Sequence, residues 1–145
     1  MRSRRPIGAL FLAVALAACT SAPAGGPSVA DAWVRASIGT ADPVAAYLVI
    51  TNSTGHDDAL LGASSPAAAS AEVHETSTDE GGMTGMAPVA RLDVPAGSTV
   101  RLAPGGMHLM LMGLIRPLRV GDSVELDLMF EHAGRLVVQA EVRQG

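Results

Sequence analysis

Short β-type segments alternate with turn residues along most of this chain, and this alternation restricts the folds open to it. From Asp31 onward, runs rich in Val, Leu, Ala and Thr are interrupted every few residues by Gly, Pro, Asn or Asp, which favour chain reversals. No run there keeps a helical period for long enough to predict a helix, and there is no βαβ rhythm. The pattern therefore predicts an all-β domain, built as an antiparallel sandwich or barrel.

Nine strands are expected from these runs. They cover residues 32–36, 45–51, 59–63, 71–74, 89–94, 99–102, 107–114, 123–130 and 136–142. Five glycine-containing turns are expected at residues 52–55, 95–97, 104–106, 120–122 and 132–134. The stretch from Pro66 to Ala71 fits either a strand or one helical turn, because alanine favours helix and proline is tolerated at a helix start.

The length and composition of the chain fit one hydrophobic core. It has 145 residues, of which only 3% are aromatic, and beyond the first residues the large rings are Trp33, Tyr47 and Phe130 alone. Aliphatic side chains must therefore fill the interior. We expect a single domain over residues 31–145.

The start of the chain has the pattern of a secretion signal. Arg2, Arg4 and Arg5 precede an apolar run over residues 7–16, which is too short to span a bilayer as a helix. The run ends in Leu-Ala-Ala-Cys at residues 16–19, which resembles the lipobox of bacterial lipoproteins. The resemblance implies cleavage after residue 18 and lipid attachment at Cys19.

The alternative to a lipoprotein signal is an ordinary signal peptide with a chance cysteine near its cleavage site. Cys19 is the only cysteine, so the chain can form no intrachain disulfide. Residues 19–30 are small and rich in Gly and Pro, as in a flexible tether. We therefore expect an extracytoplasmic domain, lipid-anchored to a bacterial membrane on its periplasmic or cell-surface side.

The charge of the chain argues against nucleic acid as a partner. The formal net charge is −4, and removal of the three leader arginines would leave about −7. The sequence contains no lysine, and its remaining arginines are scattered. These features exclude a basic nucleic-acid footprint and leave little support for electrostatic attachment to anionic lipid.

Methionine and histidine are concentrated in one part of the sequence. Five of the seven methionines fall within thirty residues, and His74 and His108 lie in or beside that window. In a strand over residues 107–114, His108, Met110 and Met112 would share one face. Thioether sulfur suits Cu(I), and imidazole binds copper in either oxidation state. This face therefore predicts a copper site, and the lack of a thiolate beyond Cys19 argues against a blue-copper centre.

Four segments resemble the bacterial periplasmic copper chaperone family PCu(A)C. They are Tyr-Leu-Val-Ile-Thr-Asn at residues 47–52, Val-His-Glu-Thr at 73–76, Gly-Met through Met-Ala-Pro-Val at 82–89, and Pro-Gly-Gly-Met-His-Leu-Met-Leu-Met-Gly-Leu at 104–114. The metal motif of this family is a histidine, ten residues, a methionine, twenty-one residues and then His-any-Met. The resemblance implies that His74, Met86, His108 and Met110 are the copper ligands.

The chain departs from this motif at one place. Eleven residues, rather than ten, separate His74 from Met86, so the Gly-rich loop is one residue longer and Met83 is an alternative ligand. The resemblance favours Met86, because the Ala-Pro-Val after it at residues 87–89 resembles the segment just after the ligand methionine in the family.

The resemblance also implies a fold and a task. The fold is a cupredoxin-like, Greek-key β-sandwich with the metal near one end. The task is to carry Cu(I) outside the cytoplasm, in relatives toward the dinuclear copper centre of a cytochrome c oxidase subunit, often alongside Sco-type chaperones. Two alternatives stay open: a copper-sequestering or resistance lipoprotein, and a Met-rich interaction module without metal.

An enzyme is not expected from this sequence. It contains no nucleophile-elbow motif, no metalloprotease helix motif and no nucleotide-binding glycine loop. His56 and His132 lie in predicted turns or beside them, and we interpret both as solvated rather than catalytic.

Overall fold

The structure, a computed structural model, describes residues 25–145. This part of the chain contains ten β-strands. The strands are β1 (Ser28–Arg35), β2 (Val44–Thr51), β3 (Asp58–Ser64), β4 (Ala68–Thr78), β5 (Thr84–Pro88), β6 (Leu92–Val94), β7 (Thr99–Leu102), β8 (Met107–Leu114), β9 (Ser123–Phe130) and β10 (Gly134–Arg143). Residues 25–145 contain no helix of the length and apolar character needed to cross a membrane.

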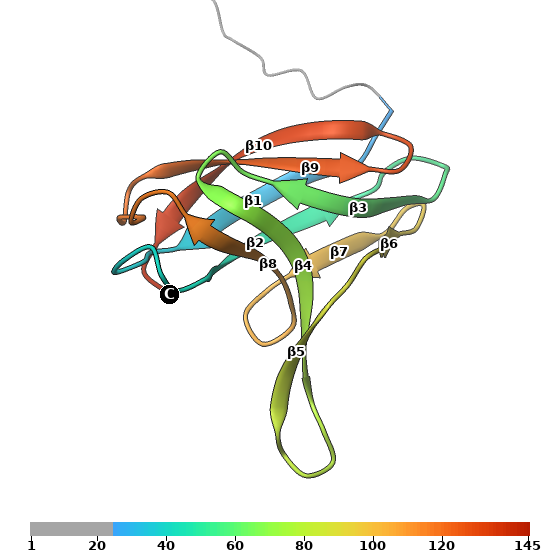
Figure 1. Ribbon diagram of the computed structural model, residues 1–145. Coiled ribbons are helices and arrows are strands. Elements are labelled where there is room, and N and C mark those ends of the chain that lie inside the picture. Colours follow the sequence, from blue (N-terminus) through green and yellow to red (C-terminus); the bar gives the residue numbers. More distant parts are fainter. Residues whose placement is uncertain (1–24) are drawn as a thin grey trace, which may run out of the picture.

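The strands form one sheet that folds back on itself into a barrel-like sandwich (Figure 1). Their order is β5-β4-β8-β2-β1-β10-β9-β3-β6, with β7 paired to β2. A pairing between β3 and β4, through Ala63 and Ala71, joins the strands that are second from each end of this path. The all-β fold predicted from the sequence is thus confirmed.

One pairing departs from the antiparallel pattern that the sequence predicted. β1 runs parallel to β10, with Trp33 opposite Glu141, while every other pairing among the described strands is antiparallel. The first and last strands therefore lie side by side in the middle of the sheet path. A parallel neighbour needs a long connection, and here nearly the whole domain supplies it.

Successive side chains of β8 point alternately to the core and to the outer face. Leu109 and Leu111 are fully buried, and across the ladder Val73 and Ala71 of β4 face the same interior. Burial of a leucine side chain contributes roughly 1.5–3 kcal/mol, so this inward face fixes the register of β8. As a consequence, Met110, which lies between Leu109 and Leu111, points to the outer face.

Most of the predicted strands are confirmed, and three local differences stand out. Each of the nine predicted strands overlaps an observed one, but β5 lies where we expected a Gly-rich loop. β1 begins at Ser28, so residues 28–30 are strand rather than tether. The stretch that fitted strand or helix is a turn followed by β4.

Three expectations fall outside the part of the chain that is described. These are the signal peptide over residues 1–18, the lipid attachment at Cys19, and the part of the tether up to residue 24.

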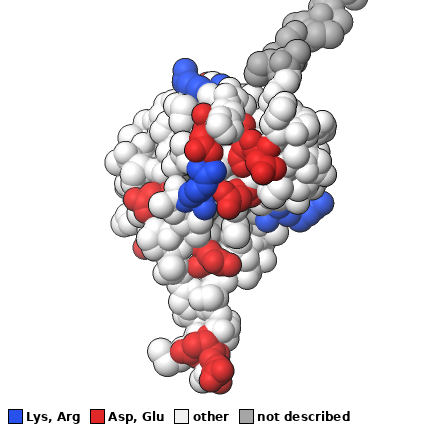
Figure 2. Space-filling model, turned by 90° about the vertical axis from the view of Figure 1, so that its right-hand side faces the viewer, with Lys and Arg blue, Asp and Glu red and all other residues white. Residues whose placement is uncertain are grey.

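The β4–β5 hairpin projects from the body of the domain (Figure 1). Its tip is a defined turn, because the Asp79 carboxylate accepts hydrogen bonds from the backbone N–H groups of Gly81 and Met83, both at 2.9 Å. Asp79 and Glu80 give this tip the acidic surface seen in Figure 2. The hairpin carries Met86 on β5 beside the outer face of β8.

Candidate metal centre

The outer face of β4, β5 and β8 brings together the side chains that the sequence singled out. His74 on β4 lies directly opposite His108 on β8. On the other side of β4, Met86 of β5 lies opposite Thr76, which is two residues from His74 and therefore on the same face. Met110 comes two residues after His108, on that same face of β8. Three strands thus supply the two imidazoles and two thioethers.

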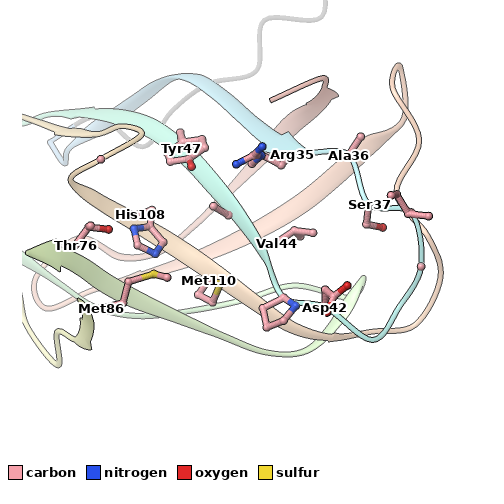
Figure 3. A pocket seen from close by; sticks show the side chains of 15 residues that line it. Arg35, Ala36, Ser37, Asp42, Val44, Tyr47, Thr76, Met86, His108 and Met110 are labelled. Carbon is pink, nitrogen blue, oxygen red and sulfur yellow. The ribbon is translucent and has the colours of Figure 1, made fainter. Parts of the chain in front are cut away.

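An open pocket of ≈ 440 Å³ lies on this face. Figure 3 shows Met86, His108 and Met110 gathered at one end of it. Tyr47 of β2 lines the same pocket, and the segment after β1 forms its far wall with Ser37 and Asp42. A small ion bound between the sulfur and imidazole atoms would be partly shielded from water yet open on one side.

His108 is held in one orientation by the backbone. It is only 4% exposed, and its Nδ1 lies 3.1 Å from the carbonyl oxygen of Gly106. A carbonyl can only accept, so Nδ1 carries the hydrogen and Nε2 keeps its lone pair. An imidazole fixed in this way is suited to bind a metal through Nε2.

His74 lies beside His108, with ring centroids 6.0 Å apart and ring planes tilted by 45°. A metal–imidazole bond is about 2 Å long, so this separation leaves room for one ion between the two rings. The Nε2 of His74 is 3.2 Å from a carboxylate oxygen of Glu72. Both rings therefore have a polar partner on one nitrogen and a second nitrogen free for an ion.

The two candidate loop methionines lie in different places. Met86 is 60% exposed and lines the pocket with His108 and Met110. Met83 is 74% exposed at the hairpin tip and is not among the pocket residues. The structure brings Met86, and not Met83, to the pocket that His108 and Met110 line.

Histidine, cysteine and carboxylate side chains form no further metal-ligand cluster on the described part of the chain. Residues 25–145 contain no group of three or more His, Cys, Asp and Glu side chains arranged to hold a metal ion. The remaining histidines, His56 and His132, lie outside the site; His56 is exposed in a turn, and the His132 side chain is 69% exposed.

Sequence reasoning missed several residues that surround this site. Glu72 could have been found, because it precedes His74 by two residues and strand alternation places both on one face. Tyr47 could not, because only the pairing of β2 with β8 brings it to the pocket. Tyr47 is in turn packed against Trp33, with ring centroids 4.6 Å apart.

Comparisons with known proteins agree on one family. The family described as "Putative lipoprotein LpqE-like" matches residues 28–142. The protein "Putative lipoprotein Lxx21020" of Leifsonia xyli subsp. xyli (strain CTCB07) is 36% identical over 140 residues, which cover 94% of this chain and 83% of that protein.

Solved structures of copper-binding domains have the same fold. The copper-bound PCuAC domain from PmoF2 is 27% identical, with a TM-score of 0.71 over 83% of this chain and 95% of that one. The solution structure of Cu(I)-bound DR1885 from Deinococcus radiodurans is 36% identical, with a TM-score of 0.64 over 89% of this chain and 84% of that one. This chain therefore belongs to the LpqE-like family and, as its motifs indicated, to the PCuAC family of domains.

Proposed function

We propose that this protein is an extracytoplasmic copper carrier that holds one Cu(I) ion through His74, Met86, His108 and Met110 and passes it to an acceptor protein. The observation that carries the proposal is the pocket at which Met86, from a projecting hairpin, meets His108 and Met110 on β8. Two imidazoles and two thioethers form a neutral, soft ligand set, which favours Cu(I) over zinc and over hard cations.

Relatives of this chain support copper as the cargo. One similar solved structure is a copper-bound PCuAC domain, and another contains Cu(I). The two histidines of this chain each have one nitrogen engaged by an oxygen acceptor, at 3.1 Å for His108 and 3.2 Å for His74. Such outer contacts are typical of metal-ligating imidazoles.

Release of the ion would begin at Met86. This residue lies on β5, an edge strand that pairs only with β4 and whose five residues are all exposed. His108 and Met110 lie on β8, which is paired on both sides, with β4 and β2. Edge segments open more easily than central strands. We therefore expect the acceptor's ligand to replace Met86 first, while His108 and Met110 still hold the ion.

The destination we propose is the copper centre of cytochrome c oxidase, reached alone or with a Sco-type chaperone. This part rests on the PCu(A)C resemblance. We also propose that Cys19 carries the lipid that anchors the protein outside the cytoplasm. The leader pattern supports this anchor, as does the relative named as a lipoprotein.

The test is a Cu(I) titration against a competing chelator with protein starting at Gly25, which retains all ten strands. We expect the wild type to bind one ion, and we expect His108→Ala and Met110→Leu to weaken binding. Met129→Leu is the matched control, because Met129 lies on β9 away from the pocket. If the wild type cannot compete with a modest chelator for Cu(I), the proposed copper site is wrong. The alternative function, a Met-rich interaction module without metal, would then be favoured.

A second measurement separates a carrier from a sequestering protein. Copper-loaded protein is mixed with increasing amounts of a metal-free copper acceptor, and the rate of transfer is recorded. For a carrier the rate rises with acceptor concentration, because the acceptor's ligands enter before the ion leaves. A rate that stays at the spontaneous dissociation rate would identify a copper buffer.

A further inference from the structure

We infer that Glu72 is a positioning residue for copper: it holds the His74 ring so that His74 offers Nδ1 to the ion while His108 offers Nε2. This inference rests on the proposed Cu(I) site and adds a residue to it that lies outside the four ligands.

The contact between Glu72 and His74 follows from the strand they share. They are two residues apart on β4, and both side chains point to the outer face. The carboxylate oxygen Oε2 lies 3.2 Å from Nε2 of His74. A carboxylate oxygen accepts the hydrogen bond, so Nε2 carries the hydrogen and Nδ1 keeps the lone pair that a metal needs.

The two histidines are therefore fixed in opposite tautomers. In His108 the carbonyl of Gly106 engages Nδ1, whereas in His74 the carboxylate of Glu72 engages Nε2. The partner of His108 is backbone and cannot be lost by substitution. The partner of His74 is a side chain, so the orientation of His74 depends on residue 72.

Glu72 also lies beside a second proposed ligand. In the β4–β8 ladder Glu72 is directly opposite Met110, just as His74 is opposite His108. Four neutral ligands leave the charge of Cu(I) uncompensated, and the Glu72 carboxylate places a negative charge next to two of them. The Glu72 side chain is 52% exposed, so its substitution leaves the core intact.

Glu75 provides a matched control on the same strand. It carries the same charge and adjoins His74 in sequence, but it points to the opposite face and lies opposite Met107 rather than Met110. A general effect of negative charge near the site would appear in both variants. An effect of the hydrogen bond to Nε2 would appear only at position 72.

The experiment compares wild type, Glu72→Ala, Glu72→Gln and Glu75→Ala. Long-range ¹H–¹⁵N spectra of the metal-free proteins report which nitrogen of His74 carries the hydrogen, and competition titrations report Cu(I) affinity. We expect Glu72→Ala to abolish the fixed tautomer of His74 and to weaken binding by about 10–100-fold. Glu72→Gln keeps an oxygen acceptor without the charge and should retain the tautomer and most of the affinity. Glu75→Ala should behave as wild type.

Three results would overturn the inference: an unchanged His74 tautomer in Glu72→Ala, equal affinities for Glu72→Ala and Glu75→Ala, or a loss in Glu72→Gln as large as in Glu72→Ala. Failure of the wild type to bind Cu(I) is a different result. It would remove the proposed function, while the spectra of metal-free protein would still show whether Glu72 holds the ring.

Discussion

Asp58 is a buried carboxylate at the start of β3 that joins two distant parts of the domain. Its oxygens accept hydrogen bonds from the backbone N–H groups of Ala59 at 2.8 Å, His132 at 3.0 Å and Ala133 at 3.0 Å. The last two belong to the turn between β9 and β10. Asp58 therefore fastens the β3 end of the barrel to that turn.

Substitution of Asp58 should cost stability at this junction. Asp58→Ala leaves three backbone donors without their acceptor, and we expect the free energy of unfolding to fall by about 1–3 kcal/mol. Asp58→Asn should lose less, because the amide keeps one acceptor oxygen. Urea unfolding of the two variants measures the difference. Asp57→Ala is the control, since exposed Asp57 accepts only the Ala96 N–H; an equal loss there would contradict the assignment.

The same carboxylate should contribute to acid sensitivity. Burial alone would raise the pKa of Asp58, but the hydrogen bonds from the His132, Ala59 and Ala133 N–H groups hold it below its ordinary value of 3.8. Between the folded pKa and 3.8 the unfolded chain binds more protons, so acidification through this range favours unfolding. The stabilisation is fully present above the ordinary value and is lost as the pH falls through the folded pKa.

Urea unfolding at several pH values below about 5 tests this linkage. We expect the wild type to lose stability more steeply than Asp58→Asn, whose amide has no carboxyl group to protonate. Parallel curves for the two proteins would show that Asp58 does not carry the acid response.

At the scale of the elements, the β4–β5 hairpin decides which methionine reaches the proposed ion. Met86 lines the pocket and Met83 lies at the hairpin tip. We therefore expect Met86→Leu to weaken Cu(I) binding and Met83→Leu to leave it unchanged. Both changes replace an exposed thioether by a similar apolar side chain, so each controls for the other. If chelator competition showed a larger loss of Cu(I) affinity in Met83→Leu than in Met86→Leu, Met83 rather than Met86 would be the ligand.

The end of β8 depends on a glycine with a left-handed backbone. Gly113 has φ +65°, and a Cβ there would lie 2.8 Å from the Cβ of Ala69. Gly113→Ala should lower the free energy of unfolding by about 1–3 kcal/mol, because it adds both backbone strain and a close contact. Gly85 on β5 has open space around a Cβ and no positive φ. Gly85→Ala should be near neutral in thermal unfolding, and equal losses would refute this account.

The elements that the sequence predicted well are those with a buried face. The side chains of the run from Met107 to Leu114 alternate between two faces, and the structure places Leu109 and Met110 on opposite faces as predicted. β5 was missed because Thr-Gly-Met-Ala-Pro over residues 84–88 has no apolar alternation and all its residues are exposed. Only its hydrogen bonds to β4 make it a strand, and sequence periodicity does not record them.

Contacts between distant strands could not be predicted from the sequence for the same reason. Local patterns indicate where strands begin and end, but not that β1 pairs with β10 or that Tyr47 reaches the pocket. The proposed ligands were selected from the family motif, and the observed register places His74 opposite His108. The spacing of the motif therefore agrees with this strand pairing.

At the scale of the whole molecule, the proposed site connects the projecting hairpin to the barrel. β5 pairs only with β4, so in the metal-free protein one strand ladder attaches it. An ion bound by Met86, His108 and Met110 would add a second link, from β5 to β8. A ligand that binds only the folded state stabilises it by about 2.7 kcal/mol at a free concentration of 100 times its Kd.

We therefore expect Cu(I) to raise the unfolding temperature in a concentration-dependent way and to slow amide hydrogen exchange in β5 more than in β10. β10 is the reference because it is paired on both sides, with β1 and β9, and contains none of the proposed ligands. Met86→Leu should remove the added protection of β5 while His108 and Met110 still give partial thermal stabilisation. If copper protected β5 and β10 equally in that variant and in the wild type, stabilisation would be global, and Met86 would not be the residue that connects the hairpin to the ion.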